Sequence, residues 1–155
     1  MTFKERVFKT VAEWVVERPG RSKNYDEWKQ QLRVSGAAIE ARAAQSNSPD
    51  RARSVLRHLT GIERWGQRRL QILLGAAPIQ DDYDGYQPNA DLDLAGQLAA
   101  FAQTRAATLK LVDQLKEAGV SDTQKADHND YGQLSARGWL RYLDLHASLE
   151  SKQIR

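Results

Sequence analysis

Apolar residues recur at steps of three and four over most of the chain, a spacing that keeps them on one face of an α-helix. In the first such stretch, Phe3, Val7, Val11 and Trp14 share a face. No stretch shows the alternation that is typical of a half-buried strand, so no strand is expected. The pattern predicts helices over residues 2–17, about 25–45, 49–74, 92–118, and from about 134 almost to the end of the chain.

Residues that start or stop helices support these boundaries. The sequence Arg18-Pro19-Gly20 is expected to end the first helix. Ser48 can cap the third helix, with Pro49 as its first residue. Gly75 and Gly119 are expected to close the third and fourth helices.

Two connections are long and polar. Residues 76–91 contain prolines, glycine, tyrosines and an aspartate cluster without sustained periodicity, which is typical of an ordered loop or crossover. Residues 120–133 are polar as well, and His128 within them is expected to be exposed. Tyr83, Tyr86 and Tyr131 lie in these two connections, where they can cap a site.

The helices predict one all-α domain spanning residues 1–155. Four helices of about 20 residues or more, with at least one long connection, suit a four-helix bundle with a crossover over residues 24–155. Residues 1–20 then form an additional N-terminal helix. Large rings supply much of the burial in a small bundle, so the four tryptophans are expected to be core anchors: Trp14, Trp28, Trp65 and Trp139.

The composition limits which side chains can bind a metal or act as a nucleophile. The 155 residues are 41% hydrophobic and 28% charged, and none is cysteine, so disulfides, thiolate ligands and a cysteine nucleophile are excluded. Any metal is therefore held by nitrogen and oxygen. The chain begins with mixed charged and apolar residues and has no long apolar run, so we expect no cleaved signal peptide, no membrane partner and a cytoplasmic location.

The net charge of +3 is unevenly distributed. Arginines at 53, 57, 64 and 68 form a stripe turned away from the apolar positions of their helix, which is typical of a solvated face. An alternative is that the stripe binds an anionic ligand or nucleic acid, but no recognised binding motif supports it. Five aspartates among residues 80–93 can instead attract the arginines.

The last predicted helix carries ligand-type side chains on its apolar side. His146, Glu150 and Gln153 fall on the same stripe as Trp139 and Leu143. A carboxylate moved out of water shifts its pKa, finds a cation or binds a metal. A second histidine, His58, lies near the edge of the apolar stripe of another helix, so three ligands from two helices can converge on one ion.

Each of these residues also has a simpler interpretation. His146 and His58 can be structural histidines hydrogen-bonded within the bundle. Glu150 lies near the end of the chain, where it can face water or pair with an arginine. The spacing His-xxx-Glu is common in helical proteins, so only its coincidence with the core face favours a metal site.

Three motifs together resemble the DinB-like (DinB/YfiT) superfamily of metal-dependent enzymes, over roughly residues 25–155. They are Val55-Leu-Arg-His58-Leu-Thr-Gly-Ile-Glu63-Arg-Trp65, then Phe101-Ala-Gln-Thr-Arg105, then Leu134-Ser-Ala-Arg-Gly-Trp-Leu with His146-xxx-Glu150-xx-Gln153-Ile154. The resemblance implies helices in up-down-down-up order and a divalent metal, often zinc or nickel. Carried over by position, the ligands are His58, His146 and Glu150, and Glu150 stands where the family more often has histidine.

The resemblance also implies hydrolase chemistry or transfer of a small thiol, with water or a low-molecular-weight thiol in an open metal position and a small molecule as substrate. It implies a homodimer as well. The alternative hypothesis is a helical bundle without catalysis that serves as a binding or interaction module, associated with stress. Metal analysis distinguishes the two.

Overall fold

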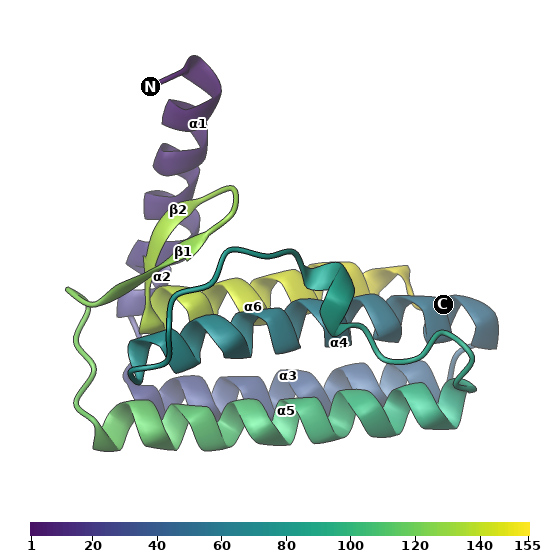
Figure 1. Cartoon of the computed structure of the whole chain (residues 1–155). Helices are drawn as coiled ribbons and strands as arrows, with labels where there is room; N and C mark the ends of the chain where they lie inside the picture. Colours follow the sequence, from purple (N-terminus) through teal and green to yellow (C-terminus); the bar gives the residue numbers. More distant parts are fainter.

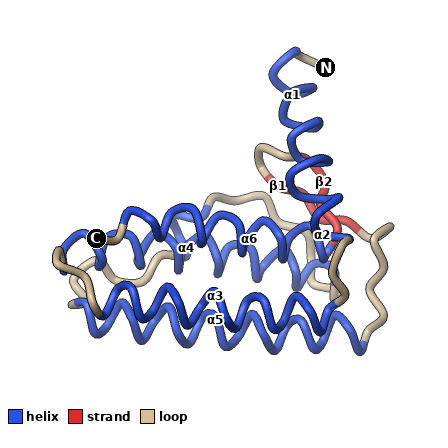
Figure 2. Tube along the Cα trace, turned by 180° about the vertical axis from the view of Figure 1, so that it is seen from behind, coloured by secondary structure: helices blue, strands red, loops and turns tan.

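Four long helices form the body of the protein. A computed structural model describes residues 1–155, and in it these helices lie side by side (Figure 1; Figure 2). The chain is predominantly helical, as its periodicity predicts. The four are α3 (Tyr25–Ala44), α4 (Pro49–Leu73), α5 (Leu94–Glu117) and α6 (Ala136–Glu150).

Side-chain caps fix the starts of three of these helices, α3, α5 and α6, close to the predicted residues. The Asn24 side chain accepts from the backbone N–H of Glu27, and the Glu27 carboxylate accepts from the N–H of Asn24. Pro49 is the first residue of α4, as predicted, but the Ser48 side chain makes no capping hydrogen bond, so the predicted cap is not formed. At α6 the Ser135 hydroxyl accepts from the backbone of Gly138. No helix is long and apolar enough to cross a membrane.

The N-terminal helix is longer than predicted. It comprises α1 (Phe3–Val11), a π-helical segment η1 (Ala12–Glu17) and α2 (Arg18–Arg21), so the predicted end at Arg18-Pro19-Gly20 is wrong. Pro19 lacks a backbone N–H and would interrupt a regular α-helix. Here the wider π-turn immediately precedes it, with the N–H of Arg18 bonded five residues back to Glu13.

A buried carboxylate ties this helix to α6. The side chain of Glu17 is almost fully buried and accepts from the backbone N–H of Ser135 at 2.7 Å, while Arg21 lies 3.3 Å from its other oxygen. A Cβ atom on Gly138 would lie only 1.9 Å from a carboxylate oxygen of Glu17. Glycine is therefore required at position 138.

We expect Gly138→Ala to lower the free energy of unfolding by about 1–3 kcal/mol, because the added methyl group displaces a buried, hydrogen-bonded carboxylate. Chemical denaturation measures the loss. Gly85→Ala is the matched control, since nothing lies within 4 Å of a Cβ built there. Equal effects at the two positions would contradict the packing argument.

A short hairpin corrects the expectation that no strand is present. Strands β1 (Lys125–His128) and β2 (Gly132–Ser135) pair antiparallel between α5 and α6. The strands are four residues each, too short for a clear period-2 pattern, and the inward positions of β1 are a small alanine and a histidine. His128 is thus buried, and its predicted exposure is wrong.

Three of the four tryptophans are core residues, as predicted. Trp28, Trp65 and Trp139 are each at most 3% exposed and belong to the larger hydrophobic cluster. Trp14 is 60% exposed and is stacked under the guanidinium of Arg18, 3.9 Å from the ring centre, so its predicted burial is wrong. It lies in the π-helical segment, where the wider turn changes which side chains face inward.

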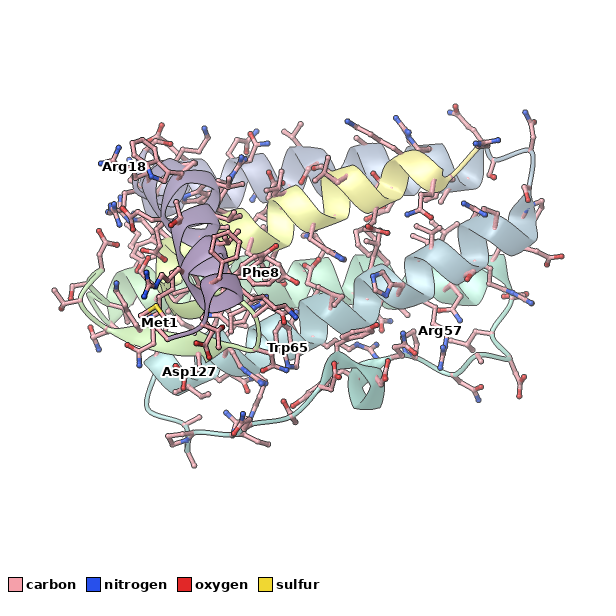
Figure 3. The ribbon with its side chains drawn as sticks, turned by 90° about the horizontal axis from the view of Figure 1, so that it is seen from above. Met1, Phe8, Arg18, Arg57, Trp65 and Asp127 are labelled. Carbon is pink, nitrogen blue, oxygen red and sulfur yellow. The ribbon has the colours of Figure 1, made fainter.

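The predicted solvated arginine face is largely covered by the crossover, residues 74–93, which contains the 3₁₀ turn η2 (Tyr83–Tyr86). Figure 3 shows Arg57 reaching from α4 towards it, and Arg57 donates to the backbone oxygen of Pro88 at 2.8 Å. Arg64 and Arg68 donate to the carbonyls of Tyr86 and Ala77. The prediction failed because unpaired carbonyls of an irregular segment need donors, and the arginines supply them.

The crossover also forms an ion pair with an arginine of α4, as expected from its cluster of aspartates. Arg69, which is 1% exposed, lies 2.5 Å from the carboxylate of Asp81. The guanidinium stacks on Trp65, with 4.6 Å to the ring centre. The arginine and aspartate clusters therefore fix the crossover against α4.

Candidate functional site

His58 and His146 meet between α4 and α6. Their Nε2 atoms are 3.3 Å apart and the ring centres 5.2 Å apart, and both side chains are half-buried. They belong to helices far apart in the sequence that pack against each other. The structure therefore brings together two of the three predicted ligands.

Burial keeps the imidazole ring of His146 uncharged. It lowers the pKa of His146 to about 4, and the positive charge of His58 when protonated lowers it further. His146 is therefore neutral at neutral pH. When both rings are neutral, one Nε2 donates its hydrogen to the other, and no other protein group bonds to either ring.

Glu150 does not join this pair. It is half-buried, and its Oε2 accepts from the side-chain amide of Gln153 at 2.7 Å. No group of three His, Cys, Asp or Glu side chains is placed to hold a metal ion. Gln153, predicted on the apolar stripe, is exposed, because α6 ends at Glu150 and a 3₁₀ turn (Ser151–Gln153) changes the angular step between side chains.

Two tyrosines flank the histidine pair. The ring of Tyr83, from the crossover, meets His58 edge-on with 5.3 Å between ring centres. Tyr142 lies one helical turn before His146, 5.9 Å between ring centres. Burial raises the pKa of Tyr142 well above its usual value, so its hydroxyl remains a hydrogen-bond donor. The position of Tyr83 agrees with the prediction that the crossover caps the site.

Tyr142 is a residue that the sequence reasoning missed. Its spacing of four from His146 on α6 was the available signal, because residues four apart lie on the same side of a helix. The other two capping tyrosines do not contact either ring of the pair. Tyr86 instead donates to Asp81, and Tyr131 stacks on His128 with 4.7 Å between ring centres.

The distance between the two imidazoles suits a metal ion. Two nitrogens that each lie about 2.0–2.1 Å from a tetrahedral ion are separated by roughly 3.3 Å, by trigonometry from the bond lengths and angle. The Nε2 atoms have this separation. Glu150 fits less well, since its carboxylate must exchange the hydrogen bond from Gln153 for the ion. Residues four apart lie on the same side of a helix, but the structure does not place the Glu150 carboxylate with the two imidazoles around one point.

His128 belongs to a different part of the structure. Its Nδ1 accepts from the backbone N–H groups of Asp130 and Tyr131, which fixes the turn of the hairpin. The ring packs against Trp65 and Tyr142, with 5.1 and 4.5 Å between ring centres. Burial lowers its pKa to about 3, so His128 is a neutral structural residue.

A well-formed groove of the surface lies away from the histidine pair. A groove of about 540 Å³ between the crossover and the hairpin is lined by Arg69, Ile79, Asp127 and other residues, but by neither His58 nor His146. Asp127 marks this groove in Figure 3. No protein-family model, curated protein or solved structure matches the chain.

Proposed function

We propose that the protein is a metal-dependent enzyme of the DinB-like type, in which His58, His146 and Glu150 hold a divalent zinc or nickel ion. The observation that carries the proposal is the 3.3 Å separation of two imidazole Nε2 atoms from different helices, because neither ring has another protein partner. Burial keeps His146 neutral at neutral pH, and a neutral imidazole has a nitrogen lone pair that can bind a metal.

The helix arrangement supports the proposed four-helix bundle with up-down-down-up order. In Figure 1 the crossover returns along the body after α4, and α5 starts near the end where α4 starts. Those two helices thus run in the same direction, while α3 and α6 run in the other. Long crossovers of this kind occur in bundles that hold metals between facing helices.

The proposed chemistry is hydrolysis or the transfer of a low-molecular-weight thiol to a small substrate. The metal, when bound, supplies Lewis-acid activation of a water or thiol. The neutral ring of His146 is a ligand without prior loss of a proton. The Tyr142 hydroxyl, which keeps its hydrogen, can donate to a substrate oxygen beside the pair, and Tyr83 shields His58 from solvent.

Metal analysis tests the proposal. We expect the purified protein to bind close to one zinc or nickel ion per chain, measured by elemental analysis and by calorimetric titration. His58→Ala and His146→Ala should lose this binding. Glu150→Gln, which keeps a partner for Gln153, should weaken it at least about 10-fold, the loss typical of even a supporting residue.

The matched control is Asp91→Asn, which removes an exposed carboxylate from the crossover and should leave affinity unchanged. An intact protein that takes up neither ion under any tested condition would contradict the proposal. So would stoichiometric binding that survives both histidine substitutions, since the ion would then lie elsewhere.

A non-catalytic binding module is the second candidate. It is favoured by the hydrogen bonds already present: the two histidines bond to each other, and Glu150 bonds to Gln153. In that case His58→Ala leaves the fold and any partner binding unchanged. A large loss of partner binding in this variant would count against the module.

A further inference from the structure

Two buried hydrogen-bond donors beside the groove between the crossover and the hairpin have no acceptor within the protein. They are the Nε–H group of Arg69 and the Nε2–H group of His128, residues that are 1% and 6% exposed. Both residues line the groove, and their burial places them at its floor. Buried donors in folded proteins are nearly always paired, so these two are available to an acceptor that enters the groove.

The hydrogen of the His128 ring is on Nε2. Its Nδ1 accepts from the backbone N–H groups of Asp130 and Tyr131, at 3.1 and 3.2 Å, so Nδ1 carries no hydrogen. The one hydrogen of a neutral imidazole then lies on the other nitrogen. The Nε2 atom is therefore a donor, and no group of the protein accepts from it.

The two donors are held in place by their surroundings. The Nη1 atom of Arg69 lies 2.5 Å from a carboxylate oxygen of Asp81, and Nη2 donates to the Asp81 backbone oxygen. The guanidinium stacks on Trp65, and the ring of His128 meets the same indole edge-on, with 5.1 Å between ring centres. A ligand therefore loses little affinity to the ordering of these side chains.

The charges around the groove favour an uncharged acceptor. The positive charge of Arg69 is already balanced by Asp81. Asp127 lies at the edge of the groove (Figure 3), is exposed and forms no ion pair. With Asp81 counted, one positive and two negative charges surround the groove. This surplus repels a carboxylate ligand and attracts an amino group.

We infer that the groove binds an amino-acid amide, a small molecule with an uncharged carbonyl oxygen and a protonated amino group. The carbonyl oxygen has two lone pairs, so it can accept from both Arg69 and His128. The amino group lies towards Asp127, and Ile79 offers an apolar contact for the ligand side chain. The volume of about 540 Å³ is within the range of small-molecule sites.

This site is independent of the proposed metal centre, because neither His58 nor His146 lines the groove. Its test therefore uses the full chain without added metal. Binding of an amide in the groove and binding of a metal at the histidine pair can then succeed or fail separately.

The first test is calorimetric titration with leucinamide. We expect one site with a Kd of roughly 0.1–1 mM, a range that suits a ligand of this size. 3-Methylbutylamine, which lacks the carboxamide, should bind at least about 10-fold more weakly, because both donors stay unpaired. 4-Methylpentanamide, which lacks the amino group, should bind about 2–5-fold more weakly, the loss typical of an exposed charge pair.

A substitution at the edge of the groove tests the position of the amino group. Asp127→Asn should weaken leucinamide binding about 2–5-fold and leave 4-methylpentanamide binding unchanged, since only the charge is removed. Asp91→Asn, which removes an exposed carboxylate outside the groove, is the matched control and should affect neither ligand. His58→Ala should also leave leucinamide binding unchanged.

The second test observes the two donors directly in the unaltered protein. In nuclear magnetic resonance spectra, leucinamide should shift the side-chain N–H signals of Arg69 Nε and His128 Nε2, and 3-methylbutylamine should not. His128→Phe keeps an aromatic ring but removes one donor, so it should weaken leucinamide binding about 3–10-fold. Circular dichroism verifies that this variant is folded.

Three outcomes would overturn the proposal. One is that leucinamide does not bind, since water alone would then pair with the two donors. Another is that leucine binds as tightly as leucinamide, because the charge argument excludes a carboxylate. The third is that His58→Ala abolishes leucinamide binding, which would place the ligand at the histidine pair.

Discussion

Replacing Arg105 by methionine is expected to lower the free energy of unfolding by about 3–5 kcal/mol, the usual cost of removing one partner of a buried ion pair. Arg105 on α5 and Glu63 on α4 are 3% and 2% exposed. The guanidinium donates through two nitrogens to the two carboxylate oxygens, at 2.7 and 2.9 Å. Without it, a carboxylate is left buried and unpaired between two of the long helices.

Other groups around the pair depend on the same guanidinium. It also donates to the backbone oxygen of Leu32 and to the hydroxyl of Ser35, both on α3. Arg105 therefore connects three helices, and its loss removes a charged donor from acceptors on the other two. Thr108 continues to donate to Glu63, but one neutral hydrogen bond does not compensate for a missing cation.

A double substitution separates the charge effect from the packing effect. Glu63→Gln in the Arg105→Met background removes the unpaired charge and should recover a large part of the lost stability, as measured by guanidinium denaturation. Arg105→Lys keeps the charge but not the planar, two-nitrogen geometry, so an intermediate loss is expected. A loss below about 1 kcal/mol for Arg105→Met would show that the pair contributes little.

The sequence was sufficient to predict the long helices, because their apolar residues keep a helical period and residues that start or stop helices, such as Pro49 and Gly119, mark their ends. The observed bounds of α3 and α4 lie within one residue of the predicted ones. The N-terminal region was harder to predict, since a π-turn is a local change in the backbone that no pattern of apolar residues specifies. That change carries the helix through Pro19 and leaves Trp14 in solvent.

The candidate site was predicted in part for a related reason. His58 and His146 each lie beside an apolar stripe, and two helices that pack by these stripes bring their edges together. The environment of Glu150 depends instead on how the last turn of α6 ends. A switch from α to 3₁₀ geometry turns Gln153 outward, and its side-chain amide donates a hydrogen bond to the Glu150 carboxylate. His128 was misplaced because a polar loop and a short hairpin look alike in sequence, whereas only the fold shows the aromatic rings around it.

The protein is expected to lose stability steeply as the pH falls below about 6.5, because two histidines are neutral in the folded state. Their pKa values are about 3 for His128 and about 4 for His146, below the ordinary value of 6.5, and burial is the main cause for both. Between these values and 6.5 the unfolded chain binds more protons than the folded one, so stability decreases as the pH falls.

The size of the effect follows, for each histidine, from the difference between its pKa in the folded chain and its pKa in the unfolded chain. At pH 4.5 each histidine alone is expected to cost about 2–3 kcal/mol, since one pKa unit corresponds to about 1.4 kcal/mol. Together they remove roughly 5 kcal/mol, which is comparable to the whole stability of a small domain. The pKa of Asp81 is lowered by hydrogen bonds from Tyr86 and Arg69, which outweigh burial, and that of Asp122 by its ion pair with Arg137. Both groups contribute mainly below about pH 4 and do not obscure this range.

Denaturant titrations at several pH values between 4.5 and 7 measure the slope. In His128→Asn the side-chain oxygen can still accept from the turn N–H groups, while the titrating ring is absent, so the slope should fall to about half that of the unaltered protein. His128→Phe instead keeps an aromatic ring in the cluster and should show the same reduced slope, whatever its absolute stability. A slope unchanged in both variants would mean that folding does not lower the pKa of His128, so that the ring is protonated in the folded state over this pH range. The enclosure of the ring by Trp65, Trp139 and Tyr142 opposes that protonation.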